Sequence, residues 1–148
     1  MIYNKFISNE KPHKLAVLID PDKYGTESVF KILGICNKSN VDFIMVGGSL
    51  VSQPIDGFVA EIKKRTDLPV VLFPGSLFQI SDNADSILLL SLISGRNPEY
   101  LIGNHVLAAP LLKKSKLEII PTGYILVDSG KATSVQYISN TLPIPSNK

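Results

Sequence analysis

The sequence contains a single cysteine, Cys36, among its 148 residues. One cysteine excludes an internal disulfide framework and fits a reducing compartment, so we expect a cytoplasmic protein. No apolar run approaches the ~20 residues needed to span a bilayer, and residues 1–14 lack the apolar segment of a signal peptide. The net charge is only +2 and the lysines are scattered, so no nucleic acid partner is expected.

Several familiar catalytic patterns are also missing. The chain has no phosphate-binding or dinucleotide-binding glycine motif, no zinc-ligand spacing, and no Ser/His/Asp or Cys/His set. His13 has no visible partner, and His105 falls in a predicted helix away from the strand ends, where a surface or packing role is expected. Cys36 lies among apolar residues and is interpreted as a small buried hydrophobic side chain.

What the chain does contain is an apolar run, residues 15–19, that stops at Asp20-Pro21-Asp22-Lys23. A short apolar run ended by proline predicts a buried strand, and the lack of alternation favours a parallel one. The carboxylates then follow the carboxyl end of that strand, the edge at which α/β folds carry out chemistry.

The same arrangement recurs along the chain, whose 45% apolar content is enough for one domain with a core. Further strands are predicted at residues 43–46, 69–73, 86–90 and 117–120. Helical spacing predicts a helix capped by Thr26 and a second one starting near Ser52 and Pro54. Their predicted buried faces are Val29, Ile32, Leu33 and Cys36 in the first helix, and Ile55, Phe58, Val59 and Ile62 in the second.

A third helix is predicted from Asn97-Pro98-Glu99, ending or kinking near Ala109 because Pro110 lacks an amide N–H. The residues before strand one are expected to form a lead-in strand or arm. Residues 133–138 are expected to return as a hairpin strand.

Alternating strands and helices predict a parallel α/β sheet. From the residues alone, it is either an open doubly wound sheet or the first part of a (β/α)8 barrel. A closed barrel needs ~200 residues or more, so a barrel of this length would be a partial one of about five βα units.

Two strand ends stand out as candidate sites. Asp20 and Asp22 could hold Mg²⁺, which takes oxygen ligands and is commonly bound by one or two carboxylates plus a substrate phosphate. Asp-Pro-Asp-Lys is equally typical of a turn. Gly47-Gly48-Ser49 ends the next strand and is expected to offer free backbone N–H groups and a hydroxyl. On adjacent barrel strands, Asp20 and Ser49 would lie within reach of one ion.

The remaining strand ends are small, polar and contain glycine, which suits contact with a phosphate but also suits ordinary βα turns. These loops contribute Gly75 and Ser76, then Arg96 as the one fixed cation, then Gly123 and Tyr124.

Taken together, the loops resemble those of the geranylgeranylglyceryl phosphate synthase / PcrB-type prenyltransferases. The resemblance covers nearly the whole chain. Within this family, the chain resembles the bacterial geranylgeranylglyceryl branch more than the heptaprenyl PcrB branch. Enzymes of the PcrB branch carry a lysine at the position where this chain has Leu18. The segments that carry it are residues 18–23 (LIDPDK), 46–49 (VGGS), 73–76 (FPGS), 94–100 (SGRNPEY), 104–106 (NHV), 120–124 (IPTGY) and 141–145 (TLPIP).

The resemblance implies that residues 1–148 are the N-terminal part of one TIM-barrel domain. It implies Mg²⁺-dependent transfer of a geranylgeranyl group from its diphosphate to the 3-hydroxyl of sn-glycerol 1-phosphate, in ether-lipid synthesis. Asp20 matches the metal-binding aspartate of the family and Ser49 its serine or threonine ligand. The helix at Tyr100 is expected to help set the tail length. The other residues expected to contact substrate are Asp22, Lys23, Gly47, Gly48, Gly75, Ser76, Arg96, Gly123 and Tyr124.

The family continues beyond the stretch matched here. Its glycerol phosphate loops and its general base are absent from these 148 residues, so the catalytic residues are expected C-terminal to Lys148. The resemblance also implies a homo-oligomer and is consistent with peripheral membrane contact.

Two alternatives remain open. The first is a non-catalytic barrel fragment that acts through association with another chain. The second is another phosphate-binding barrel enzyme, such as an aldolase or isomerase. That class needs a catalytic Lys or Glu at a strand end, for which Lys23 is the nearest candidate.

Overall fold

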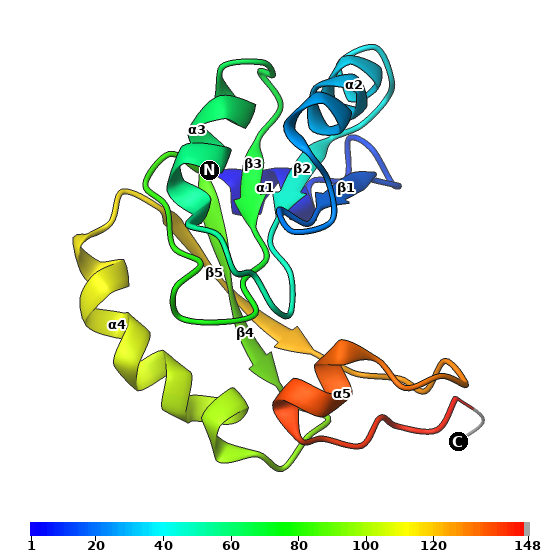
Figure 1. Cartoon of the computed structure of the whole chain (residues 1–148), viewed down its shortest axis with the longest axis vertical. Coiled ribbons are helices and arrows are strands. Elements are labelled where there is room, and N and C mark those ends of the chain that lie inside the picture. The colour runs from blue at the N-terminus through cyan, green and yellow to red at the C-terminus, as the bar shows by residue number, and fades with distance from the viewer. Residues whose placement is uncertain (147–148) are drawn as a thin grey trace.

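A computed structural model describes residues 1–146 as one five-stranded parallel sheet (Figure 1). The strands are β1 (Ala16–Ile19), β2 (Phe43–Val46), β3 (Val70–Leu72), β4 (Ser86–Leu92) and β5 (Glu118–Tyr124). Their order in the sheet is the order in the chain. Every crossover therefore moves in the same direction, as in a barrel, whereas a doubly wound sheet reverses direction.

Helices cover the outer face of this sheet, as the helical spacing predicts. The outer helices are α2 (Thr26–Cys36), α3 (Ile55–Lys63) and α4 (Asn104–Lys114), the last of which is preceded by a π-helical turn, η1 (Glu99–Gly103). In α2, Gly25 rather than Thr26 takes the N-cap position. The predicted faces of the first two helices are confirmed, with Cys36 buried and Ile32 and Phe58 packed against the core.

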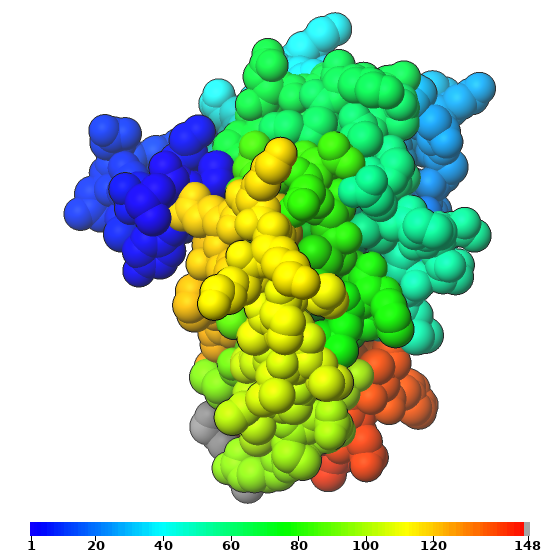
Figure 2. All heavy atoms as spheres, turned by 90° about the vertical axis from the view of Figure 1, so that its left-hand side faces the viewer, coloured from blue at the N-terminus to red at the C-terminus, as the bar shows by residue number. Residues whose placement is uncertain are grey.

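The N-terminal residues form a helix, α1 (Ile2–Ile7), and not the predicted strand or arm. It packs on the opposite, inner face of the sheet, where the ring of Phe6 stacks on Phe43 with centroids 4.2 Å apart. The carboxylate of Glu118 accepts hydrogen bonds from the backbone N–H groups of Ile2 and Tyr3, at the exposed N-terminal end of α1. Figure 2 shows this segment beside β5.

The third predicted helix begins where expected, and of the two outcomes predicted near Ala109, an end or a kink, the helix does not end there. The side chain of Asn97 accepts a hydrogen bond from Glu99 N (3.1 Å), and α4 then runs through Pro110 to Lys114. Proline inside a helix costs ~3 kcal/mol. Buried Ala108 and Leu112 on either side of Pro110 offset that cost by packing.

Two further predictions about elements are corrected. Residues 133–138 are not a hairpin strand, because α5 (Ser134–Ser139) begins with a capping box between Thr133 and Gln136. The strands β4 and β5 also extend past their predicted ends, to Leu92 and Tyr124. Pro121 is tolerated inside β5 because β5 is an edge of the described sheet.

The crossover from β3 to β4 differs from the other three. Residues 73–85 contain no helix, whereas α2, α3 and α4 cover the other crossovers. A side of β4 that a helix would otherwise cover is left to loop residues. A cavity at the carboxyl ends of the strands extends into this space.

Candidate functional site

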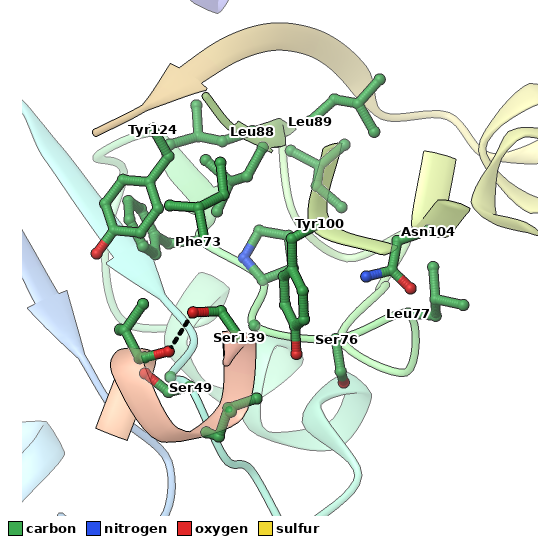
Figure 3. A pocket seen from close by; sticks show the side chains of 18 of the residues that line it. Ser49, Phe73, Ser76, Leu77, Leu88, Leu89, Tyr100, Asn104, Tyr124 and Ser139 are labelled. Carbon is green, nitrogen blue, oxygen red and sulfur yellow. Dashed lines mark hydrogen bonds between the residues drawn. The ribbon is translucent and has the colours of Figure 1, made fainter. Parts of the chain in front are cut away.

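A cavity of about 410 Å³ opens at the carboxyl ends of the strands. Polar side chains line it from the loops after β1, β2 and β3 and also from η1, α4 and α5, and apolar side chains line it from β4, α4 and the helix-free crossover (Figure 3). The polar lining includes Asp20, Lys23, Ser49 and Ser76, and the apolar lining includes Leu77, Ile80, Leu89, Ala108 and Leu112.

Asp20 lies directly after β1, and only 13% of its side chain is exposed. Its Oδ1 accepts a hydrogen bond from Asp22 N (3.1 Å), and its Oδ2 lies 3.2 Å from Lys23 Nζ. Asp22 itself does not line the cavity, because its carboxylate accepts a hydrogen bond from Ser52 N at 2.8 Å. The loop after β1 therefore fixes Asp20 from two sides and is tied to the loop after β2.

Ser49 lines the same cavity as Asp20. Gly48 lies against the Asp20 carboxylate so closely that a Cβ on Gly48 would come within 2.8 Å of Oδ2. The Ser49 hydroxyl accepts a hydrogen bond from the hydroxyl of Ser134, on α5, at 3.4 Å.

The expectation of free glycine N–H groups is wrong. Gly47 N donates to Ile19 O (3.2 Å), and Gly48 N donates to the Oε1 of Gln79 (3.3 Å). These glycines serve close packing between loops, because a side chain at either position would collide with its neighbours.

The donor set at this edge suits a hard cation that keeps other ligands. Within residues 1–146, no three His, Cys, Asp or Glu side chains gather as a complete metal cage. The Asp20 carboxylate and the Ser49 hydroxyl are both oxygen donors facing one cavity. They fit Mg²⁺, which is usually bound by one or two carboxylates together with substrate phosphates and water.

The aromatic ring of Tyr100 projects into the cavity from η1 (Figure 3). Burial raises the pKa of the Tyr100 phenol, so the hydroxyl stays neutral at physiological pH. His105 also lines the cavity, and its Nε2 lies 2.8 Å from Leu90 O. The contact with β4 fits the packing role that was expected for His105, and its place in the cavity lining was not predicted.

The helical spacing of the residues that line the cavity from η1 and α4 could have revealed His105. Tyr100, Asn104, His105, Ala108 and Leu112 follow an i, i+4, i+5, i+8, i+12 pattern, which is one face of a helix.

The other predicted residues divide into two groups. Lys23, Gly48, Gly75, Ser76 and Tyr124 line the cavity, whereas Gly47 and Gly123 do not. Arg96 is exposed and lies in a separate hollow with Asn140 and Thr141. Sequence reasoning missed the lining residues of α5, namely Val135, Ile138 and Ser139, because it predicted a strand there.

Comparisons with known proteins relate the chain to one family. The sequence profile of the PcrB family matches residues 7–148. A geranylgeranylglyceryl phosphate synthase from Chitinophaga pinensis is 53% identical over 150 residues, which cover 99% of this chain and 60% of that protein. One from Spirosoma linguale is 54% identical, over 90% of this chain and 54% of that protein. The chain thus spans little more than half the length of these curated relatives.

Two solved structures have a fold similar to that of this chain. Wild-type GGGPS from Thermoplasma volcanium matches with a TM-score of 0.82 and 34% identity, over 90% of this chain and 53% of that one. (S)-3-O-geranylgeranylglyceryl phosphate synthase from Thermoplasma acidophilum, solved with its substrate sn-glycerol-1-phosphate, matches with a TM-score of 0.81 and 36% identity, over 89% of this chain and 54% of that one. The predicted fold class, a partial TIM barrel, is confirmed.

Proposed function

The chain belongs to the PcrB family, and on that premise we propose that it forms the part of a prenyltransferase that binds the prenyl diphosphate. The proposed reaction moves a geranylgeranyl group from its diphosphate to the 3-hydroxyl of sn-glycerol 1-phosphate, in ether-lipid synthesis. The names of the curated relatives and the substrate in the Thermoplasma acidophilum structure support this choice of reaction.

The observation that carries the proposal is the two-part lining of the cavity. Asp20, Lys23 and Ser49 lie on loops at the carboxyl ends of the strands, and an apolar wall continues beside β4 and α4. A prenyl diphosphate has the same two-part character, with a charged head and a long apolar tail. The tail therefore lies along the helix-free crossover as well as along the barrel wall.

Asp20 and Ser49 are the residues proposed to hold Mg²⁺. When bound, Mg²⁺ supplies positive charge that neutralises a diphosphate leaving group. Lys23 places a second cation beside Asp20, free to turn toward a phosphate because 73% of its side chain is exposed. Asp22 keeps its loop in position through Ser52 N. Gly75 and Ser76 bring the loop after β3 against the same head group.

We expect the acceptor site and the general base to lie in a part of the enzyme C-terminal to Lys148, since the relatives are longer than this chain. The two edges of the described sheet are β1 and β5. Unpaired strand edges template association, so we also expect the chain to form a homo-oligomer or to pair with another chain. Sedimentation velocity tests this, and a monomer at all concentrations would contradict it.

None of the helices described in residues 1–146 is long and apolar enough to cross a membrane. A lipid product nevertheless implies peripheral contact with a membrane from the cytoplasmic side. Flotation of the chain with liposomes tests that expectation, and failure to float with any liposome composition would contradict it.

Titration calorimetry with and without Mg²⁺ tests the proposed function. We expect geranylgeranyl diphosphate to bind in the presence of Mg²⁺ and binding to be lost when EDTA removes the metal. Pyrophosphate, which lacks the tail, should bind about ten-fold or more weakly because it buries no apolar surface. Metal-independent binding, or equal affinity for the two ligands, would contradict the proposal.

Replacing Tyr100 by alanine should extend the apolar part of the cavity. We expect Tyr100→Ala to bind longer prenyl diphosphates more tightly, relative to geranylgeranyl diphosphate, than the unsubstituted chain does. Tyr137→Ala is the matched control, because 77% of Tyr137 is exposed and it lies outside the cavity. An unchanged preference in Tyr100→Ala would show that Tyr100 does not limit tail length.

A further inference from the structure

Gln79 is a buried amide, 2% exposed, in the helix-free crossover after β3. Its Oε1 accepts hydrogen bonds from Gly48 N (3.3 Å) and Gly75 N (3.2 Å). Its Nε2 donates to Gly48 O (2.8 Å). A single side chain thus ties together the loops that follow β2 and β3.

The two loops meet without room for any other side chain. A Cβ on Gly75 would lie 2.3 Å from Gly48 O and 2.7 Å from the Cα of Ser49. The Gln79 amide satisfies the Gly48 and Gly75 N–H groups, which would otherwise be left without a partner at this contact. An unpaired buried polar group is costly, so these hydrogen bonds hold the loops at one separation.

Gln79 reaches the proposed ion site through Gly48. Gly48 precedes Ser49 in the chain and lies against the Asp20 carboxylate. Because Gln79 holds both the N–H and the C=O of Gly48, it fixes the position of the Ser49 backbone and the distance between this loop and Asp20. The neighbours of Gln79 on the crossover, Leu77 and Ile80, line the apolar part of the cavity.

We infer that Gln79 is a positioning residue, which holds Ser49 and Asp20 at the separation needed to share one divalent cation. The inference rests on the proposed function, because that proposal assigns the cation to Asp20 and Ser49. Gln79 does not touch the ion or the substrate in this account. Gln79 links the crossover after β3, which lines the apolar part of the cavity, to the loop after β2, which carries Ser49.

The test measures Mn²⁺ affinity by electron paramagnetic resonance, with pyrophosphate present, for the chain and its Gln79→Met variant. Methionine keeps nearly the same length but can neither accept nor donate these hydrogen bonds. We expect affinity to fall by about ten-fold or more in Gln79→Met, because the loop loses its hydrogen bonds to Gln79.

Thr66→Val is the matched control for loss of a buried hydrogen-bonding side chain. Thr66 is 6% exposed, and its hydroxyl donates to Asn37 Oδ1 and accepts from Leu68 N. It lies before the amino end of β3, away from the cavity at the carboxyl ends of the strands. Thr66→Val should lower the melting temperature but leave Mn²⁺ affinity unchanged. Equal affinity losses in both variants, or none in Gln79→Met, would overturn the positioning role.

Amide hydrogen exchange provides a second measurement that needs no variant. Because Gln79 accepts both N–H groups, those of Gly48 and Gly75 should exchange slowly even without Mn²⁺ and pyrophosphate. Fast exchange of both would overturn the inference even if Gln79→Met does not fold. If the unsubstituted chain binds no Mn²⁺ with pyrophosphate, the proposed function itself is wrong, and the role of Gln79 falls with it.

Discussion

We expect the replacement of Asp20 by asparagine to lower the affinity for geranylgeranyl diphosphate in the presence of Mg²⁺ by about 100-fold or more. Asparagine has the same shape and still accepts the hydrogen bond from Asp22 N. It removes the negative charge that attracts a cation, and with it the pairing with Lys23. Titration calorimetry with and without Mg²⁺ measures the effect.

The control for charge removal is Asp67→Asn. Asp67 is exposed in the loop between α3 and β3, at the amino end of β3, whereas the cavity lies at the carboxyl ends of the strands. We expect Asp67→Asn to bind the ligand as the unsubstituted chain does. Undiminished Mg²⁺-dependent binding in Asp20→Asn would remove Asp20 from the proposed ion site.

Replacing Gly47 by alanine should destabilise the fold by about 3 kcal/mol or more. Gly47 has φ +150°, and a Cβ there would lie 2.0 Å from Phe73 O. That oxygen is backbone and cannot rotate away, so the loops after β2 and β3 must separate. Chemical denaturation followed by circular dichroism measures the free energy of unfolding.

Gly57→Ala is the matched control for the same chemical change. Gly57 lies in α3, and a Cβ there meets no atom within 4 Å. Alanine is the better helix former, so this variant should stabilise the chain by roughly 0.5–1 kcal/mol. A Gly47→Ala chain as stable as the unsubstituted one would mean that the two loops are not packed as described.

The sequence was sufficient for features that depend on local periodicity. Helical spacing correctly assigned the buried faces of α2 and α3, and the apolar runs located all five strands. Asp20 could be placed among the other strand-end loops because all parallel strands direct their carboxyl ends to one side of the sheet. The choice between a barrel and a doubly wound sheet could not be made from alternation alone, since both alternate β and α.

The errors arose where distant residues decide the local structure. α1 forms against β5 and Phe43, more than 35 residues away in the chain. α4 does not end before Pro110, and Ala108 and Leu112 on the buried side of the helix pack into the core. The glycines after β2 looked ready for a phosphate, but Gln79, 31 residues from Gly48, occupies an N–H. Sequence patterns report a residue's near neighbours, whereas hydrogen bonds and packing between loops depend on the folded chain. The loops at the ends of the strands were therefore predictable from the sequence. The contacts that bring these loops together at one cavity were decided by the tertiary structure.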